Sequence, residues 1–146
     1  MGLGRALVVD DYAVNRELLS FVLEEGGFEV RTARSAEEAL QVSAQCQPDV
    51  LVLDVQLPGM SGLDFTRQLR SRPAQQQACI VIVTSYAMDS DREQAFAAGC
   101  DGYLTKPIDT RTFVAEVLGF LNKRAQSTTV SQHSSERSLV SVPSHH

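Results

Sequence analysis

Short runs of aliphatic and β-branched residues alternate with longer helical stretches along the chain from Arg5 to Arg124. Two of the short runs resemble edge strands, because Glu29–Thr32 alternates between polar and apolar residues and Gly102–Leu104 is very short. Three more are apolar throughout, as expected of strands that helices cover on both faces: Ala6–Val9, Val50–Leu53 and Ile80–Val83. The pattern therefore predicts three central strands and two flanking ones.

Helical periodicity fills the segments between these strands. The apolar residues of Leu18–Leu23 recur at helical spacing, and the pair Gly26-Gly27 ends that helix. Ser35 and Glu38 have the spacing of a capping box at the start of a second helix, which ends before Pro48. Further helices are expected at Gly62–Arg70, Ser90–Ala98 and Asp109–Lys123. Strands that alternate with helices in this way predict an α/β fold with a doubly wound parallel sheet.

The composition changes beyond Lys123, where serine is frequent and apolar residues are few. Such a segment cannot bury enough surface to offset the entropy lost on ordering. The total of 146 residues suits a single ordinary domain. We therefore predict one domain over residues 1–124, followed by a flexible tail or truncated linker over residues 125–146.

Charge and apolar content exclude two classes of partner. The net charge of −5 leaves no basic stripe for a nucleic acid, so direct binding of DNA or RNA is not expected. No apolar run approaches the roughly 20 residues that span a bilayer, so no membrane association is expected. The cysteines lack the paired spacing of a zinc site or a disulfide framework, and we interpret them as reduced core thiols of a cytoplasmic protein: Cys46, Cys79 and Cys100.

The positions of the histidines exclude histidine chemistry in the predicted domain. All three lie in the predicted tail, at His133, His145 and His146. The predicted domain therefore has no histidine to phosphorylate and none for a Ser-His-Asp triad. A histidine kinase and a phosphotransfer core are excluded on the same ground.

Polar side chains follow each central strand of the predicted sheet. The first strand ends in Asp10-Asp11, the third in Asp54 and the fourth in Thr84, while Lys106 follows the fifth. Ligands of open parallel sheets bind at the carboxyl ends of the strands, so we expect these side chains to face one crevice. Each residue taken singly has an ordinary interpretation as a helix cap, a strand end or a surface charge; their joint placement at one edge argues against it.

The residue types at this edge suit phosphoryl transfer. Converging carboxylates repel one another, and oxygen ligands without His or Cys favour a hard cation, so we predict Mg²⁺, with Mn²⁺ as a substitute. Lys106 supplies a fixed positive charge and Thr84 a hydroxyl donor, which can hold the oxygens of a phosphoryl group. Together these residues predict a site that works by positioning and electrostatics.

Four motifs in this order resemble those of the response-regulator receiver domain of two-component signalling, a family that includes the chemotaxis regulators. They are Leu7-Val-Val-Asp-Asp11, Leu53-Asp-Val-Gln-Leu-Pro-Gly-Met-Ser-Gly62, Val83-Thr-Ser85 and Gly102-Tyr-Leu-Thr-Lys-Pro107. The resemblance covers nearly all of residues 5–124. It implies a flavodoxin-like (βα)5 fold whose five parallel strands have the order 2-1-3-4-5.

The resemblance also implies a role for each acidic residue. Asp54 is expected to be the phosphoacceptor, which takes a phosphoryl group from a phosphohistidine and forms an acyl phosphate. Asp11 is expected to bind Mg²⁺ directly and Asp10 mainly through water. Asp54 itself and the backbone carbonyl of Gln56 are expected to complete the metal site.

The remaining implied roles concern signalling. Thr84 and Lys106 are expected to bind the phosphoryl group, and Tyr103 to swing inward as a switch when Thr84 moves. Phosphorylation then rearranges the surface around the fourth helix, fifth strand and fifth helix. Gln56 and Tyr86 are expected to tune dephosphorylation, and we hypothesise that Tyr86 shields the acyl phosphate; an ordinary exposed loop tyrosine is the alternative.

Two other functions share parts of this pattern. A metal-dependent phosphatase with an aspartyl-phosphate intermediate has a second Asp two residues after its nucleophile, where this chain has Gln56. An FMN-binding flavodoxin-like module has a Ser-, Thr- and Gly-rich phosphate loop after its first strand, where Asp10-Asp11 would repel a phosphate. The preferred interpretation is a signalling switch rather than a turnover enzyme, with catalysis limited to its own phosphorylation and dephosphorylation.

The resemblance implies a sensor histidine kinase or a histidine phosphotransfer protein as the phosphodonor, and a downstream protein target that the sequence does not identify. A phosphorylation-dependent dimer is a further alternative. Whether the chain acts alone or belongs to a hybrid kinase or larger regulator also stays open.

Overall fold

The computed structural model describes residues 3–72, 78–85 and 88–137, with side chains described as far as Ala125. Its five strands form one parallel sheet in the order β2-β1-β3-β4-β5, which confirms the predicted order. The strands are β1 Gly4–Val9, β2 Phe28–Ala33, β3 Val50–Leu53, β4 Cys79–Thr84 and β5 Gly102–Thr105. The three apolar runs therefore form the centre of the sheet, as their patterns predicted.

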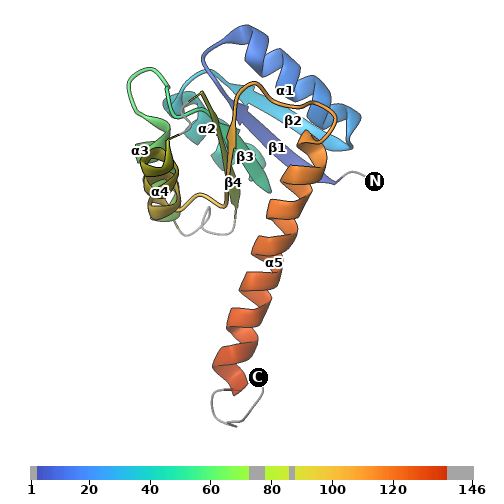
Figure 1. The fold of residues 1–146 in the computed structure, drawn as a ribbon, viewed down its shortest axis with the longest axis vertical. Helices are drawn as coiled ribbons and strands as arrows, with labels where there is room; N and C mark the ends of the chain where they lie inside the picture. Colours follow the sequence, from blue (N-terminus) through green and yellow to red (C-terminus); the bar gives the residue numbers. More distant parts are fainter. Residues whose placement is uncertain (1–2, 73–77, 86–87, 138–146) are drawn as a thin grey trace.

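Helices cover both faces of this sheet. In Figure 1, α1 and α5 lie on one side of the sheet and α2, α3 and α4 on the other. Their bounds are α1 Ala13–Glu25, α2 Ala36–Cys46, α3 Gly62–Arg70, α4 Asp89–Ala98 and α5 Phe113–Arg137. Parallel neighbouring strands need a crossover, and each crossover here contains one of the predicted helices.

Two apolar cores result, one on each face of the sheet. Because successive side chains of a strand point to opposite faces, Leu51 and Leu53 pack under α2 to α4 while Val50 and Val52 pack under α1 and α5. Every residue of β3 and β4 is buried. The three cysteines are buried and unpaired, as predicted, and Cys79 and Cys100 belong to different cores.

One of the two hydrogen bonds of the predicted capping box at Ser35 is present. The Ser35 hydroxyl accepts a hydrogen bond from the backbone N–H of Glu38 at 3.2 Å. The Glu38 carboxylate, however, accepts from the N–H of Arg34 at 2.7 Å and not from Ser35. The cap therefore fixes the start of α2 while its return bond is displaced by one residue.

The last helix differs from its prediction at both ends. It begins at Phe113 rather than Asp109, because the Asp109 carboxylate accepts the N–H of Arg111 at 3.0 Å and forms a turn instead. It continues to Arg137 rather than ending at Lys123, so part of the segment predicted to be flexible is helical. No Gly or Pro interrupts the sequence between Arg124 and Arg137, so nothing in the backbone forces a stop. The division at residue 124 stays a prediction.

An ionic network ties α5 to the sheet at its amino edge. The Asp101 carboxylate, which follows α4, pairs with Arg70 of α3 at 2.7 Å and with Arg124 of α5 at 2.8 Å. It also accepts the backbone N–H of Ile80 at 2.9 Å. One partly buried carboxylate thus joins three elements far from the carboxyl edge.

No helix within the described residues is long and apolar enough to cross a membrane.

Candidate functional site

The predicted acidic residues lie side by side at the carboxyl edge of the sheet. Val9 pairs with Leu53 in the register of β1 and β3, so Asp10 and Asp54 are the next residues on adjacent strands. The backbone N–H of Asp10 donates to Ala33 at 3.1 Å, and that of Asp54 donates to Val9 at 3.2 Å. The sheet's own hydrogen bonds therefore continue into the site and fix the two backbones.

Lys106 joins the two carboxylates. Its Nζ lies 2.7 Å from Asp54 Oδ2 and 3.4 Å from Asp10 Oδ2. The backbone N–H of Lys106 donates to the carbonyl of Thr84 at 2.8 Å, which holds the loop after β5 against the end of β4. The three side chains are 20%, 10% and 3% exposed for Lys106, Asp54 and Asp10, so the ion pairs are largely shielded from water.

The charge balance of this cluster favours protonated Lys106. Burial alone lowers its pKa, but the hydrogen bond and charge of Asp54, followed by those of Asp10, raise the pKa above its ordinary value. The ammonium is therefore fixed in its charged form at neutral pH. A permanent positive charge at this position can compensate negative charge on Asp54 or on a group attached to it.

Backbone and amide donors orient the same carboxylates. Asp10 Oδ1 accepts the N–H of Tyr12 at 2.9 Å, and Asp10 Oδ2 accepts from Asn15 Nδ2 at 3.3 Å. Asp54 Oδ1 accepts the N–H of Gln56 at 3.0 Å. The role of Asn15 was missed from the sequence. Its place in the first turn of the helix after Asp10-Asp11 was the available signal, because that turn must pass over the strand end.

The other predicted site residues differ in how far they are buried. Thr84 is 1% exposed and ends β4, one residue beyond the position level with Asp54. Asp11 and Gln56 are exposed, and the backbone N–H of Gln56 donates to Asp54. Tyr86 lies outside the described residues. The structure therefore brings together Asp10, Asp54 and Lys106, with Thr84 at the same edge.

The predicted metal site of three carboxylates stays a prediction. Within the described residues, no group of three or more His, Cys, Asp or Glu is placed to hold a metal ion. Asp11 is exposed, while Asp10 and Asp54 share the single positive charge of the Lys106 ammonium. The donor set still fits Mg²⁺, which binds one or two carboxylates and fills its remaining positions with water.

Gly62 at the start of α3 also shapes the site, and this role was missed from the sequence. The N–H of Gly62 donates to the carbonyl of Val55 at 2.7 Å. A β-carbon on Gly62 would collide with the carbonyl oxygen of Asp54 and would lie 2.9 Å from Leu53 Cδ1. Only glycine lets α3 approach the backbone of Asp54 this closely.

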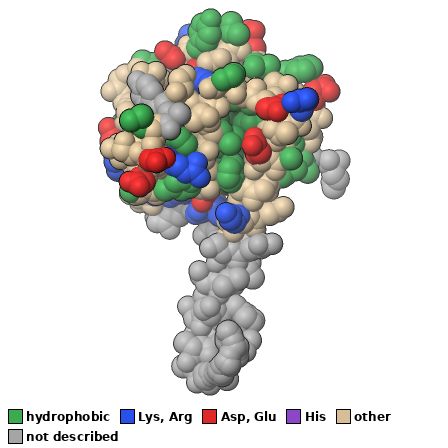
Figure 2. All heavy atoms as spheres, in the orientation of Figure 1, with side chains coloured by type: hydrophobic (Ala, Val, Ile, Leu, Met, Phe, Trp, Pro, Cys, Tyr) green, Lys and Arg blue, Asp and Glu red, His purple; other side chains and the backbone are tan. Residues whose placement is uncertain are grey.

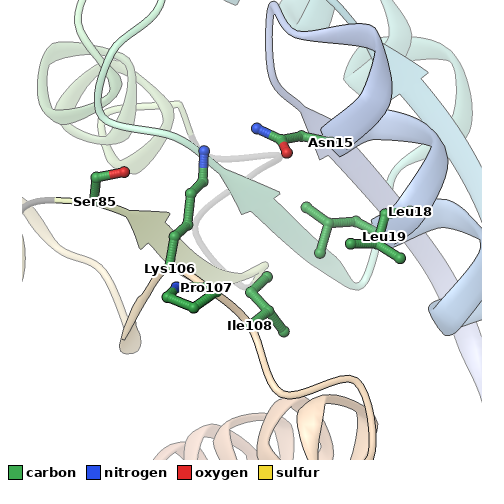
Figure 3. A pocket seen from close by; sticks show the side chains of 7 residues that line it. All are labelled: Asn15, Leu18, Leu19, Ser85, Lys106, Pro107 and Ile108. Atoms are coloured by element: carbon green, nitrogen blue, oxygen red, sulfur yellow. The ribbon is translucent and has the colours of Figure 1, made fainter.

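A hollow of about 390 Å³ opens beside Lys106, between α1 and the loop after β5. Figure 3 shows the amide of Asn15 and the ammonium of Lys106 directed toward one another at one side of it. Leu18 and Leu19 of α1 face Ile108 across the other side (Figure 3). The hollow therefore combines an apolar wall with the charged end of the site.

Comparison with known proteins agrees with this geometry. The family model described as the response regulator receiver domain matches residues 6–118, which is most of the chain. The chain belongs to this family. The receiver is 32% identical to the polar-differentiation response regulator DivK of Brucella ovis over 115 residues, which are 79% of this chain and 94% of DivK.

Solved structures of similar receivers share the fold. A response regulator from Chloroflexus aurantiacus J-10-fl, itself described as putative, is 36% identical, with a TM-score of 0.78 over 82% of this chain and 98% of that one. The chemotaxis response regulator CheY4 of Vibrio cholerae is 28% identical, with a TM-score of 0.76 over 80% and 97%. The flavodoxin-like fold expected from the motifs is confirmed.

Membership of the family settles the general function. The chain is a receiver domain of two-component signalling, a phosphoryl-accepting switch and not an enzyme in the usual sense. Its partners as a receiver are histidine kinases or phosphotransfer proteins. The relatives named above are response regulators and favour neither the phosphatase nor the FMN alternative.

Proposed function

We propose that this receiver accepts its phosphoryl group on Asp54, with Lys106 as the charge partner of that group. The observation that carries the proposal is the contact of Lys106 Nζ with Asp54 Oδ2 at 2.7 Å, beside Asp10 at 3.4 Å. Of the two carboxylates that Lys106 contacts, Asp54 is the nearer one. It is 8% exposed, and its Oδ1 accepts a hydrogen bond from a backbone N–H. A nucleophile that is oriented and still reachable is what phosphoryl transfer requires.

The proposed transfer uses these contacts directly. A carboxylate oxygen of Asp54 attacks the phosphorus of a phosphohistidine, the phosphorus–nitrogen bond breaks, and the imidazole leaves with the bonding electrons and takes up a proton. Lys106 neutralises charge on the transferred oxygens, and the Thr84 hydroxyl donates to one of them. Receiver domains generally bind Mg²⁺ at this acidic pocket; here Asp10, Asp11, Asp54 and the Gln56 carbonyl would hold it, and it would neutralise phosphoryl charge.

The signal would pass through β4 and β5. Thr84 is nearly buried at the end of β4 and pairs in register with Thr105, two residues after Tyr103 on β5. A shift of Thr84 toward the phosphoryl group changes the space beside the Tyr103 ring, and we propose that this alters the surface of α4, β5 and α5. We also propose that Gln56 and Tyr86 tune dephosphorylation. Catalysis by the domain is proposed to be limited to its own phosphorylation and dephosphorylation.

An apolar stripe on α1 is the proposed docking face for the phosphodonor. Val14, Leu18 and Phe21 follow one another at helical spacing and are 58%, 44% and 61% exposed. Figure 2 shows hydrophobic side chains on the surface over α1, among charged groups. The stripe borders the hollow that leads to Lys106, and a protein that delivers a phosphohistidine to Asp54 must contact this rim.

Intact-mass analysis after treatment with acetyl phosphate tests the acceptor. We expect one phosphoryl adduct with Mg²⁺, a much weaker adduct with EDTA, and no adduct in Asp54→Asn. Asp64→Asn, which changes an exposed acid on α3, is the matched control and should keep the adduct. An adduct that persists in Asp54→Asn would refute the assignment.

The docking face is tested separately with a phosphorylated histidine phosphotransfer protein as donor. Phe21→Ser should slow transfer from this protein while leaving labelling by acetyl phosphate unchanged, because the small donor needs no docking surface. Equal transfer rates in Phe21→Ser and the unaltered chain would count against the stripe as the docking face.

A further inference from the structure

Arg92 on α4 lies against two aromatic rings that belong to different elements. Its guanidinium carbon is 5.3 Å from the centroid of Phe96, one turn later on the same helix. It is also 6.0 Å from the centroid of Tyr103 on β5. One exposed arginine therefore connects the outer surface of α4 to the residue proposed above as the switch.

The Tyr103 ring is in a buried position in this structure. Its residue is 7% exposed, and it belongs to the core on the α2 to α4 face together with Ala95 of α4 and Ile82 of β4. Ile82 is the register partner of Tyr103, so the ring lies over the strand that ends in Thr84. The ring is therefore held among side chains of α4 and β4.

We propose that Arg92 is a positioning residue that holds the Tyr103 ring in its buried position, so that α4 biases the switch toward the buried ring. A cation over an aromatic face is attracted to the ring, and this attraction is lost when the ring turns away. The Phe96 ring also contacts the guanidinium and limits the space in which it can move. The consequence for signalling rests on the proposed function of Tyr103; the position of the ring does not.

Charge around the ring is consistent with this contact. Burial, and then the nearby Asp91 carboxylate and Cys100, raise the pKa of the Tyr103 hydroxyl, whereas Arg92 lowers it. Arg92 is thus close enough to act on the phenol through its charge as well as on the face of the ring. A partly exposed cation–π contact changes the balance between the two ring positions about two- to fivefold.

Tyrosine fluorescence can report this balance directly. The 146 residues include three tyrosines and no tryptophan, so Tyr12→Phe with Tyr86→Phe leaves Tyr103 as the single emitter. In that background, Arg92→Gln should increase acrylamide quenching of Tyr103. Arg92→Lys, which keeps the charge, should restore part of the protection, and Arg111→Gln, at an exposed arginine of the loop before α5, should change nothing.

The same measurements are repeated with Asp54→Asn, where phosphorylation is absent by design. The effect of Arg92→Gln on quenching should be the same there, so failure of the proposed phosphoacceptor would not affect it. Unchanged quenching in Arg92→Gln, with unfolding midpoints equal by circular dichroism, would overturn the inference. If Arg92→Gln lowers the unfolding midpoint, the test moves to Arg92→Lys. Suppose that Arg92→Lys unfolds at the midpoint of the unaltered chain but is quenched as strongly as Arg92→Gln; this result would also overturn the inference.

The link to signalling has its own readout. Beryllofluoride with Mg²⁺, a mimic of a bound phosphoryl group, is titrated into the single-tyrosine chain with and without Arg92→Gln. If the buried ring favours the phosphorylated state, the beryllofluoride concentration at half saturation rises about two- to fivefold in Arg92→Gln. If quenching increases in Arg92→Gln while the beryllofluoride concentration at half saturation is unchanged, the coupling between Arg92 and the phosphoryl site is overturned.

Discussion

Lys106→Met tests whether the ammonium offsets repulsion between Asp10 and Asp54. Methionine keeps most of the apolar stem and removes only the charge. Removing one partner of a buried ion pair costs about 3–5 kcal/mol, because the remaining charge is left uncompensated. The Lys106 side chain is 20% exposed, so water offsets part of this cost and we expect a loss of about 2–3 kcal/mol.

Urea unfolding followed by circular dichroism measures the loss. With a slope of about 2 kcal/mol per M for a chain of this size, the midpoint should fall by roughly 1–1.5 M in EDTA. Mg²⁺ should stabilise Lys106→Met more than the unaltered chain, because a cation then replaces the missing charge. Lys123→Met, at an exposed lysine of α5, should leave the midpoint unchanged.

A double-mutant cycle identifies the cause of the loss. If Lys106 acts by offsetting the two carboxylates, Lys106→Met should cost at least about 1 kcal/mol less in an Asp54→Asn background. The pKa of Lys106 is raised above 10.5, so its stabilising charge is fully present below that pH and is lost only as pH rises through the higher folded value. The deficit should therefore be constant between about pH 7 and 9. Additive costs in the cycle would refute the electrostatic explanation.

Three further predictions concern the scaffold. Asp101→Asn should lower stability by about 2–4 kcal/mol in thermal unfolding, because two arginines lose their shared, largely buried carboxylate, whereas Asp109→Asn, at an exposed acid, should leave the unfolding midpoint nearly unchanged. Burial raises the pKa of Cys79 and of Cys100 to about 12, so at about pH 8 neither thiol should react with Ellman's reagent until the chain unfolds; rapid reaction in the folded state would contradict their burial. Gly62→Ala should cost about 1–3 kcal/mol in urea unfolding and slow acetyl phosphate labelling, because its β-carbon displaces the backbone of Asp54; wild-type labelling would count against that displacement.

Much of the fold follows from patterns that span only a few residues. The run Val50–Leu53 is apolar throughout, and the structure gives β3 those same bounds. The bounds of α3 also agree with the prediction, because Ser61 caps its start and Ser71 follows its end. The bounds of the last helix differ from the prediction at both ends, because Asp109 forms a turn and no Gly or Pro stops the helix between Arg124 and Arg137.

The polar residues that end the strands could be predicted from the sequence, because strand ends follow from local hydrophobic patterns. How those residues meet depends on the packing of the whole domain. Lys106 contacts Asp54 across 52 positions of sequence and Asp10 across 96, and Asp11, adjacent to Asp10, faces solvent instead. The contact of Arg92 with Tyr103 likewise depends on how α4 packs against β5. Such distances are set by the packing of whole helices on the sheet, and no local pattern encodes them.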